Sequence, residues 1–389
     1  MNKLGYRYII ILSYTTVFIL SMLDCSSFME DRYESQKSKI RFYLEEQISQ
    51  NNTPGIQYVV VKADSEIFRF NGGLADIASG RLINDKTTMM IYSMSKPITA
   101  IGILQLAELG KLSLDDPVIK YLPDIPYGNR LRIRHLLSQT SGIPNPLPLR
   151  WVHLKEEDGA FDEISSLRSI LEKNPDLNFV PGQKYSYSNI SYWLLGRIIE
   201  KTSGLDFKEY IRKNIFGRLH IPRNEADFAI VEQATYSKGY IRKWSVINLF
   251  KKFLIDQKFV GGYEQNWLRI RDHYVDGPAF GGVICTSNAI VSILQDLLRD
   301  KSKLIGSEMK RLLFTQQLNN KGEPIEMTLG WHIGKLDQMR FFYKEGGGAG
   351  FHSEMRIYPD LWIATVVLTN NGIFDTRSFL NTIDTEFLH

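Results

Sequence analysis

Residues 93–110 read SMSKPITAIGILQLAELG, and this stretch decides the fold. From Ile98 onward, apolar residues recur at three-residue spacing, and the run ends at Gly110, which predicts an amphipathic helix with a glycine at its C-terminal end. Proline is tolerated only in the first turn of such a helix, so Pro97 marks its start. Ser93 is therefore expected at or beside the helix N-terminus.

Ser93 and Lys96 form a Ser-x-x-Lys motif. Residues three apart lie on the same face of a helix, so the lysine nitrogen can reach the serine hydroxyl. That hydroxyl is a weak nucleophile, and lysine can activate it when burial and nearby cations lower the lysine pKa. The motif alone is weak evidence, because Ser307-Glu308-Met309-Lys310 repeats it in a polar segment. There the motif predicts only a turn of a surface helix.

A second element, Tyr187-Ser188-Asn189, precedes a predicted amphipathic helix over residues 190–201. A phenol near lysines can relay a proton to a leaving group, and the Asn189 amide can bridge Lys96 and a substrate carbonyl. The same spacing occurs at Tyr127-Gly128-Asn129, so this motif also needs support from its context. Without that support, Tyr187 would be a packed aromatic with a hydrogen-bonded hydroxyl.

The third element is Lys344-Glu345-Gly346-Gly347, which lies between two strand-like runs. Glycine lets a substrate approach a strand edge, a cation attracts an anionic group, and a strand amide can complete an oxyanion hole. The competing interpretation is a glycine-rich hairpin loop over residues 346–350 with Lys344 solvated.

The remaining pattern indicates an α+β fold. A helix is expected over residues 37–50, followed by a hairpin of strands over residues 56–61 and 66–70. Near the C-terminus, three short strand-like runs separated by turns predict an antiparallel meander, at residues 340–343, 351–358 and 362–369. Strands at both ends with helices between them suggest that the N- and C-terminal pieces share one sheet.

The three motifs together resemble the serine β-lactamase and penicillin-binding protein superfamily. The resemblance extends from about residue 37 to the C-terminus and is closest to the branch of class C β-lactamases and D-alanyl-D-alanine peptidases, which includes carboxylesterases. Three further segments share it, namely Leu114–Pro117, Arg134–Gly142 and Gly281-Gly282.

The resemblance implies a role for each motif residue. Ser93 would be the nucleophile, with Lys96 and Tyr187 as the catalytic proton-transfer pair. Asn189, Lys344 and Gly346 would bind substrate, and the backbone amides of Ser93 and Gly347 would form the oxyanion hole. Glu345 departs from the branch, which commonly has threonine there, and a carboxylate beside Lys344 should weaken recognition of an acidic β-lactam.

The resemblance also implies the domain plan and the activity. Residues 37–389 would form the catalytic domain, with a sheet lobe over about 37–112 and 276–389, an inserted all-helical lobe over about 113–275, and the site in the cleft between them. The expected function is a serine hydrolase that cleaves an ester, amide or peptide bond through an acyl-enzyme on Ser93, with D-amino-acid peptides and β-lactams among the candidate substrates. The alternative is a receptor of the same fold that binds cell-wall or membrane components without turnover.

The N-terminus predicts export. Lys3 and Arg7 precede the apolar run over residues 9–23, so residues 1–24 have the form of a signal and residues 25–36 that of a tether. Cys25 is a candidate lipid-attachment site, although Asp24 argues against it. We therefore expect a periplasmic or cell-envelope protein, with membrane attachment through Cys25 or the N-terminal segment left open. Cys285, the other of two cysteines, is expected to be a small buried residue.

Other chemistries have little support. The chain has 389 residues, is 43% hydrophobic and carries a net charge of +4, which suits a globular protein and gives no nucleic-acid footprint. No G-x-S-x-G elbow occurs, and the seven histidines form no H-E-x-x-H motif, so neither a metal nor a cofactor is expected.

One segment remains open between two interpretations. Residues 242–259 combine apolar positions near helical spacing with several lysines and an arginine. The segment would either lie on an anionic membrane surface or cover the active-site cleft with a solvated basic face.

Overall fold

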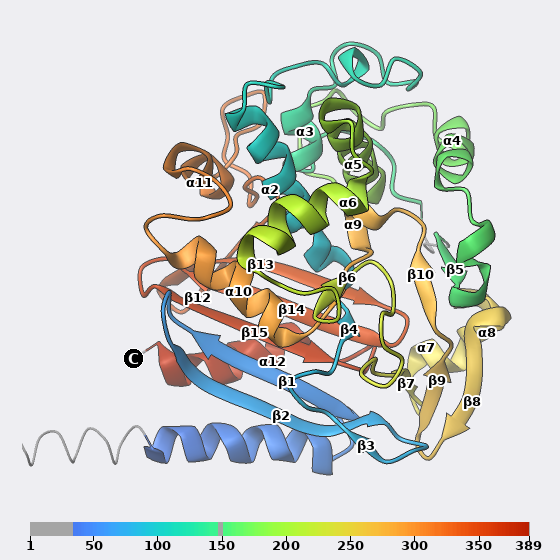
Figure 1. Cartoon of the computed structure of the whole chain (residues 1–389), viewed down its shortest axis with the longest axis vertical. Coiled ribbons are helices and arrows are strands. Elements are labelled where there is room, and N and C mark those ends of the chain that lie inside the picture. The colour runs from blue at the N-terminus through green and yellow to red at the C-terminus, as the bar shows by residue number, and fades with distance from the viewer. Residues whose placement is uncertain (1–33, 147–150, 389) are drawn as a thin grey trace, which may run out of the picture.

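A seven-stranded antiparallel sheet forms the centre of the fold (Figure 1). The computed structural model describes residues 34–146 and 151–388. Strands follow the order β12-β13-β14-β15-β1-β2-β3, so the N-terminal hairpin pairs with the C-terminal meander through β1 and β15. The prediction that both ends of the chain share one sheet is confirmed. The strands are β1 (Gly55–Val61), β2 (Glu66–Asp76), β3 (Arg81–Leu82), β12 (His332–Leu336), β13 (Met339–Gly348), β14 (Phe351–Tyr358) and β15 (Ile363–Thr369).

Both faces of this sheet are covered. All seven residues of β1 are buried, and because strand side chains alternate between faces, β1 contributes to two separate cores. Tyr58 and its same-face neighbours pack against the N-terminal helix (residues 34–49) and α12 (Thr376–Ile383), while Val59 belongs to the large core shared with the other helices. The described part of this helix includes residues 34–36, so the end of the tether predicted over residues 25–36 is helical.

Helix α2 (Ser95–Glu108) runs through the middle of the large core. The predicted helix is present, but the prediction that it is amphipathic is wrong, because twelve of its fourteen residues are buried. Helices from the inserted region and from the segments that follow it pack around α2, and α5 (Asn189–Ser203) is one of its main neighbours. As predicted, Gly110 follows α2 in the left-handed region at φ 68°, and Gly204 follows α5 in the same way at φ 75°.

The inserted region between residues 113 and 275 corrects the expectation of an all-helical lobe. Its first half is mainly helical, and its second half contains a three-stranded sheet in the order β7-β9-β8. These strands have too few residues for a period-two pattern to stand out in the sequence. The strands are β5 (Val152–Leu154), β6 (Ala226–Asp227), β7 (Gly239–Arg242), β8 (Val260–Glu264), β9 (Trp267–Ile270) and β10 (His273–Val275). The helices are α3 (Ile133–Leu137), α4 (Glu163–Lys173), α5, α6 (Phe207–Ile211), α7 (Val246–Leu249) and α8 (Lys251–Leu254).

Short helical turns and the return segments complete the chain. The 3₁₀ turns are η1 (Tyr92–Met94), η2 (Val118–Lys120), η3 (Lys155–Ala160), η5 (Gly217–Leu219), η6 (Gln257–Phe259) and η7 (Asp384–Phe387), and η4 (Arg212–Phe216) is a π-helical turn. The remaining elements are β4 (Met89–Met90), α9 (Pro278–Gly281), β11 (Ile284–Cys285), α10 (Ser287–Leu298) and α11 (Ser307–Phe314). Cys285 is fully buried, as expected.

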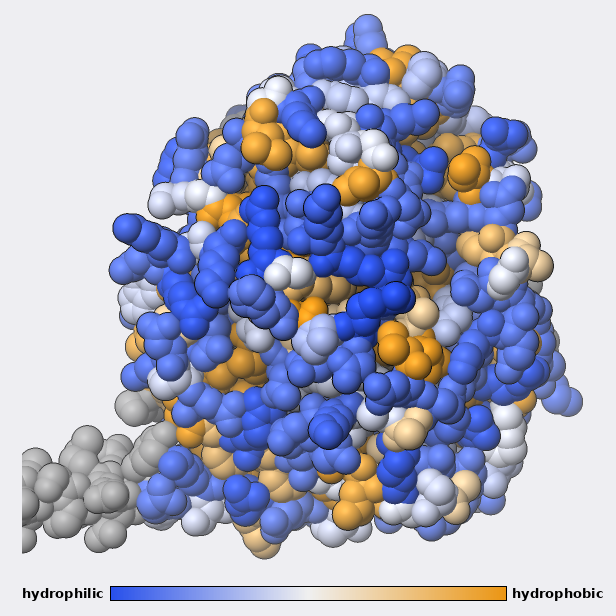
Figure 2. All heavy atoms as spheres, viewed as in Figure 1, coloured by the Kyte–Doolittle hydropathy of each residue, from blue (hydrophilic) through white to orange (hydrophobic). Residues whose placement is uncertain are grey.

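The surface and the chain ends add two observations. Hydrophilic side chains cover most of the face shown in Figure 2, with apolar side chains in small separate groups. Within residues 34–146 and 151–388, no helix combines the length and apolar character needed to cross a bilayer. The predicted signal over residues 1–24 and the candidate lipid site Cys25 lie outside the described residues.

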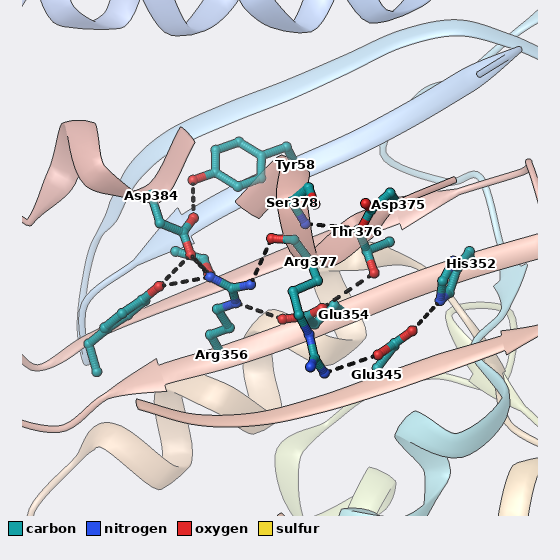
Figure 3. Close-up of polar contacts among 12 residues, drawn as sticks. Tyr58, Glu345, His352, Glu354, Arg356, Asp375, Thr376, Arg377, Ser378 and Asp384 are labelled. Atoms are coloured by element: carbon teal, nitrogen blue, oxygen red, sulfur yellow. Dashed lines mark hydrogen bonds and ion pairs between the residues drawn. The ribbon is translucent and has the colours of Figure 1, made fainter. Parts of the chain in front are cut away.

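A buried charge network fixes the C-terminal segment to the sheet (Figure 3). The Arg356 guanidinium donates to Glu354 at 2.6 Å and lies 3.6 Å from Asp384, and all three side chains are fully buried. The Asp384 carboxylate also accepts hydrogen bonds from three hydroxyl groups, those of Tyr58, Tyr358 and Thr365. The network therefore joins strands β1, β14 and β15 to the end of the chain.

We predict that Asp384→Asn lowers the free energy of unfolding by about 3 kcal/mol, because the substitution removes one of the two buried carboxylates that balance the Arg356 charge. Urea denaturation followed by circular dichroism measures this change. Asp64→Asn is the matched control, since Asp64 is 81% exposed in its ion pair with Arg299 and its loss should cost less than about 1 kcal/mol. Equal losses in the two variants would contradict the prediction.

Candidate active site

The candidate nucleophile lies on a strained turn. Ser93 is the middle residue of η1, immediately before α2, and the preceding Tyr92 has a φ of 42°. Such left-handed backbone is uncommon for a bulky residue and must be held by its surroundings. The Tyr92 hydroxyl lies 2.7 Å from the carbonyl of Ala349, to which it donates, and 3.0 Å from Nε2 of His273. These contacts hold the turn that presents Ser93.

The structure brings the three predicted proton-transfer groups together. Ser93 Oγ lies 2.6 Å from the Tyr187 hydroxyl, and Lys96 Nζ donates to the same oxygen at 2.9 Å. Ser93 and Lys96 come from η1 and α2, whereas Tyr187 comes from the segment before α5. The Ser93 hydroxyl can therefore exchange a proton with either neighbour.

Lys96 is fully buried and makes two further hydrogen bonds. Its Nζ donates to Asn189 Oδ1 and to the backbone carbonyl of Phe280, each at 2.7 Å. Burial, and to a smaller extent the charge of Lys344, lower the pKa of Lys96 well below its ordinary value. A lowered pKa makes a lysine side chain more available as a base.

Two amines lie near the ring of Tyr187. Lys96 Nζ and Lys344 Nζ are each 4.9 Å from its centroid. The Lys344 side chain is 1% exposed, so the interpretation of a solvated loop lysine is wrong. Burial lowers the pKa of Lys344 to about 7, although Glu345 acts in the opposite direction. Burial also raises the pKa of Tyr187, so its phenol keeps its proton at neutral pH.

Gly346 has a different position from the one expected for a substrate contact. A Cβ at this residue would lie 2.0 Å from the carbonyl oxygen of Ile91 and 3.0 Å from the backbone nitrogen of Met94. Gly346 therefore faces the nucleophile turn, and its lack of a side chain lets β13 pack directly against that turn. The next residue, Gly347, faces the pocket region beside Ser93.

The unusual Glu345 is engaged by two partners (Figure 3). Its carboxylate lies 2.6 Å from Nε2 of His352 and 3.3 Å from the Arg377 guanidinium. The hydrogen bond with His352, together with the charges of His352, Arg377 and Lys344, holds the pKa of Glu345 below its ordinary value. The negative charge expected to oppose an acidic substrate is thus partly offset by neighbouring groups.

Two pockets meet at Ser93. The first, which we call the polar pocket, has a volume of about 730 Å³ and combines apolar surface with the charged groups of Lys344, Glu345 and Arg377. The second has a volume of about 450 Å³ and a mainly apolar lining that includes Trp151 and Phe280. Ser93, Asn189 and Gly347 line both pockets. A substrate carbonyl at Ser93 would therefore have one substituent beside charged groups and the other in mainly apolar surroundings.

Sequence reasoning missed several residues around these pockets. Tyr185 and His332 line the polar pocket and hydrogen bond to each other at 3.1 Å. His273 and Tyr92 support the nucleophile turn, and Phe280 contributes a backbone carbonyl, which leaves no signal in side-chain identity. Position next to a motif could have indicated Tyr92 and Tyr185, but no local pattern indicated the two histidines.

The repeated motif at Ser307 serves a different purpose. It occupies the first half of α11, where Ser307 is exposed and Lys310 donates to the carbonyl of Arg299. The prediction of a surface helix turn is confirmed. Among the described residues, no group of three or more His, Cys, Asp or Glu side chains is placed to hold a metal ion.

An antiparallel sheet, a buried helix led by Ser93 and Lys96, and Tyr187 on the opposite lobe define the class of serine β-lactamase and penicillin-binding folds. The sequence model of the Beta-lactamase family matches residues 32–382. This chain belongs to that family.

Known relatives are distant in sequence. "Penicillin-binding protein 4*" of Bacillus subtilis is 26% identical over 316 residues, covering 78% of this chain and 65% of the relative. "Acyltransferase calJ" of Penicillium decumbens is 26% identical over 294 residues, covering 68% of this chain and 66% of the relative. The chain therefore spans just under two thirds of the length of these relatives.

Solved structures show the same fold. A penicillin-binding protein homologue from Pyrococcus abyssi superposes with a TM-score of 0.71 at 23% identity, covering 90% of this chain and 77% of the other. A class C beta-lactamase gives a TM-score of 0.71 at 18% identity, covering 91% of this chain and 97% of the other. The predicted α+β fold is confirmed.

We predict that Gly346→Ala slows labelling of Ser93 by a fluorophosphonate about 10²-fold, because the added methyl group must push β13 away from the nucleophile turn. Gly159→Ala is the control, since a Cβ there meets no atom within 4 Å. Gel fluorescence after timed labelling measures the rate, and circular dichroism verifies folding. If a folded Gly346→Ala protein is labelled at the wild-type rate, the close contact between β13 and the nucleophile turn does not control the reactivity of Ser93.

Proposed function

We propose that this chain is a serine hydrolase that forms an acyl-enzyme on Ser93. The observation that carries the proposal is the position of Ser93 Oγ, within 2.9 Å of Lys96 Nζ and 2.6 Å of the Tyr187 hydroxyl, where the two pockets meet. Membership of the Beta-lactamase family supports the same chemistry. We also propose that the chain is exported to the periplasm or cell envelope, on the sequence of residues 1–24.

The geometry suggests how acylation would proceed. The neutral amine of Lys96 takes the Ser93 proton while Oγ forms a bond to the substrate carbonyl carbon. The backbone amides of Ser93 and Gly347 hold the resulting oxyanion. When the intermediate collapses, the bond to the leaving group breaks and Tyr187 gives that group its proton. Lys96 then gives Tyr187 the proton that it took from Ser93, so both groups regain their original protonation states.

Deacylation uses the same groups in reverse. Water attacks the acyl carbon and gives a proton to the Tyr187 and Lys96 pair, the bond to Ser93 Oγ breaks, and Oγ regains a proton from that pair. Asn189 keeps the Lys96 amine in place through the 2.7 Å hydrogen bond. The cycle ends with a free carboxylic acid and the original protonation states.

The linings of the two pockets indicate where the acyl group and the leaving group of the substrate would bind. Tyr187 lines the polar pocket and is absent from the lining of the apolar one, so the leaving group that it protonates belongs on the polar side. The acyl group then occupies the apolar pocket. We therefore propose an ester or amide substrate with an apolar acyl group and a polar leaving group. A carboxylate on that leaving group, as in a D-amino-acid peptide, would face Lys344 and Arg377.

We predict that Ser93→Ala abolishes turnover and that Lys96→Ala or Tyr187→Phe lowers kcat by about 10²-fold or more, the scale of a general acid or base. Hydrolysis of p-nitrophenyl esters measures kcat, and mass spectrometry detects the acyl group on Ser93. Ser307→Ala, in the second copy of the motif, is the matched control and should keep wild-type kinetics. Binding of substrate without turnover or acylation would favour the receptor alternative.

For p-nitrophenyl esters, we predict that KM falls as the acyl chain lengthens from two to eight carbons, because each buried methylene contributes about 0.8 kcal/mol. Ile373→Asn, in the apolar pocket, should remove most of this dependence, whereas Leu109→Asn, on the surface, should retain it. Nitrocefin and D-alanyl-D-alanine peptides assayed in parallel test the β-lactamase and peptidase activities. A flat chain-length profile would contradict the acyl assignment.

A further inference from the structure

An exposed apolar surface lies beside the apolar pocket. We use the name docking loop for residues 242–255, which contain the end of β7 and the helices α7 and α8 (Figure 1). The apolar positions near helical spacing belong to two short helices, which are separated at Phe250 between α7 and α8. Trp244, Val246 and Leu249 are 82%, 72% and 77% exposed. Three large apolar side chains with this much exposure in one short segment are unusual on a protein surface that faces water.

The docking loop carries charge of a single sign. Its four ionisable residues are all cations, Arg242, Lys243, Lys251 and Lys252, and it contains no Asp or Glu. Lys251 Nζ donates to the Tyr263 hydroxyl at 2.7 Å, and Lys243 Nζ lies over the rings of Trp244 and Tyr263. Aromatic groups therefore hold two of the ammonium groups beside the apolar side chains. The combination of apolar, aromatic and basic residues suits the boundary between lipid headgroups and acyl chains.

The docking loop also continues into the candidate active site. Ile247 and Leu254 are partly exposed and at the same time line the apolar pocket that ends at Ser93. An apolar path thus connects the exposed surface to the proposed acyl site.

We propose that the docking loop binds the surface of an anionic lipid bilayer. Charge decides between this occupant and a second copy of the chain, because a twofold dimer through this surface would bring eight cations together. An anionic headgroup layer attracts all four cations, while Trp244, Val246 and Leu249 enter the outer part of the acyl-chain region. The binding itself does not depend on the proposed reaction.

Fluorescence at position 244 tests the proposal directly. The full-length chain with Cys25→Ser and Trp244→Cys carries one reactive thiol for a polarity-sensitive dye, since Cys285 is fully buried. Vesicles of phosphatidylglycerol and phosphatidylcholine should shift the dye emission to shorter wavelength, and pure phosphatidylcholine should not. The same dye on Leu109→Cys, an exposed residue at the end of α2, reports contacts made elsewhere on the molecule and should not shift.

Charge variants then test the electrostatic part. Lys243→Glu with Lys252→Glu should lower the vesicle partition coefficient, as reported by the dye at position 244, by about tenfold or more. The control pair Lys86→Glu with Lys303→Glu makes the same change in net charge at exposed positions outside the docking loop and should lower it less than about threefold. Equal effects of the two pairs would overturn the proposal.

Two other outcomes would also overturn it. If vesicles bind without a shift at position 244, another part of the chain makes the contact. If the dye shifts without lipid as protein concentration rises, a second copy covers the surface. Hydrolysis of a soluble acetyl ester in the same samples reports the proposed function separately, because none of the residues changed in these variants lines either pocket.

Discussion

The arrangement of the site depends on the buried amine of Lys96. Its three hydrogen bonds join η1, α5 and α9, so one side chain connects the nucleophile turn to the helical lobe and to the segment that returns from it. Burying such a group is costly unless its polar atoms are paired. The charged ammonium has an acceptor for each of its three N–H groups, whereas the neutral amine can donate to Asn189 and Phe280 and accept a proton from Ser93. The same burial lowers its pKa and makes the amine available as a base. Burial of the Lys96 amine thus both joins the parts of the site and favours its proposed role as a base.

Close backbone approach sets the second half of the site. At Gly346, β13 comes so near the nucleophile turn that no side chain fits between them, and Tyr92 links the same turn to Ala349, directly after β13. This approach places Lys344 and Gly347 beside Ser93 and separates a polar pocket from an apolar one. The apolar pocket opens towards the docking loop, which would let an apolar acyl group reach Ser93 from a lipid surface.

The expected effect of Glu345 on substrate binding changes once its neighbours in the folded chain are known. In the sequence, the Glu345 carboxylate lies beside Lys344, which predicts that this site binds acidic substrate groups less well. In the folded chain, His352 contacts it from β14, where it is the register partner of Gly347, and Arg377 contacts it from α12. Two basic side chains therefore balance its charge. The effect on substrate choice therefore depends on the whole cluster.

The sequence alone determined the motifs, the antiparallel strands at both ends and the glycines after α2 and α5, because these features depend on residue type and short-range spacing. Tertiary structure decided that α2 is buried on all sides, since that depends on elements far along the chain packing around it. It also decided the pairing of Tyr185 with His332 and the supply of an acceptor by the Phe280 backbone. These contacts join residues up to 184 positions apart, and no local pattern records which of them meet.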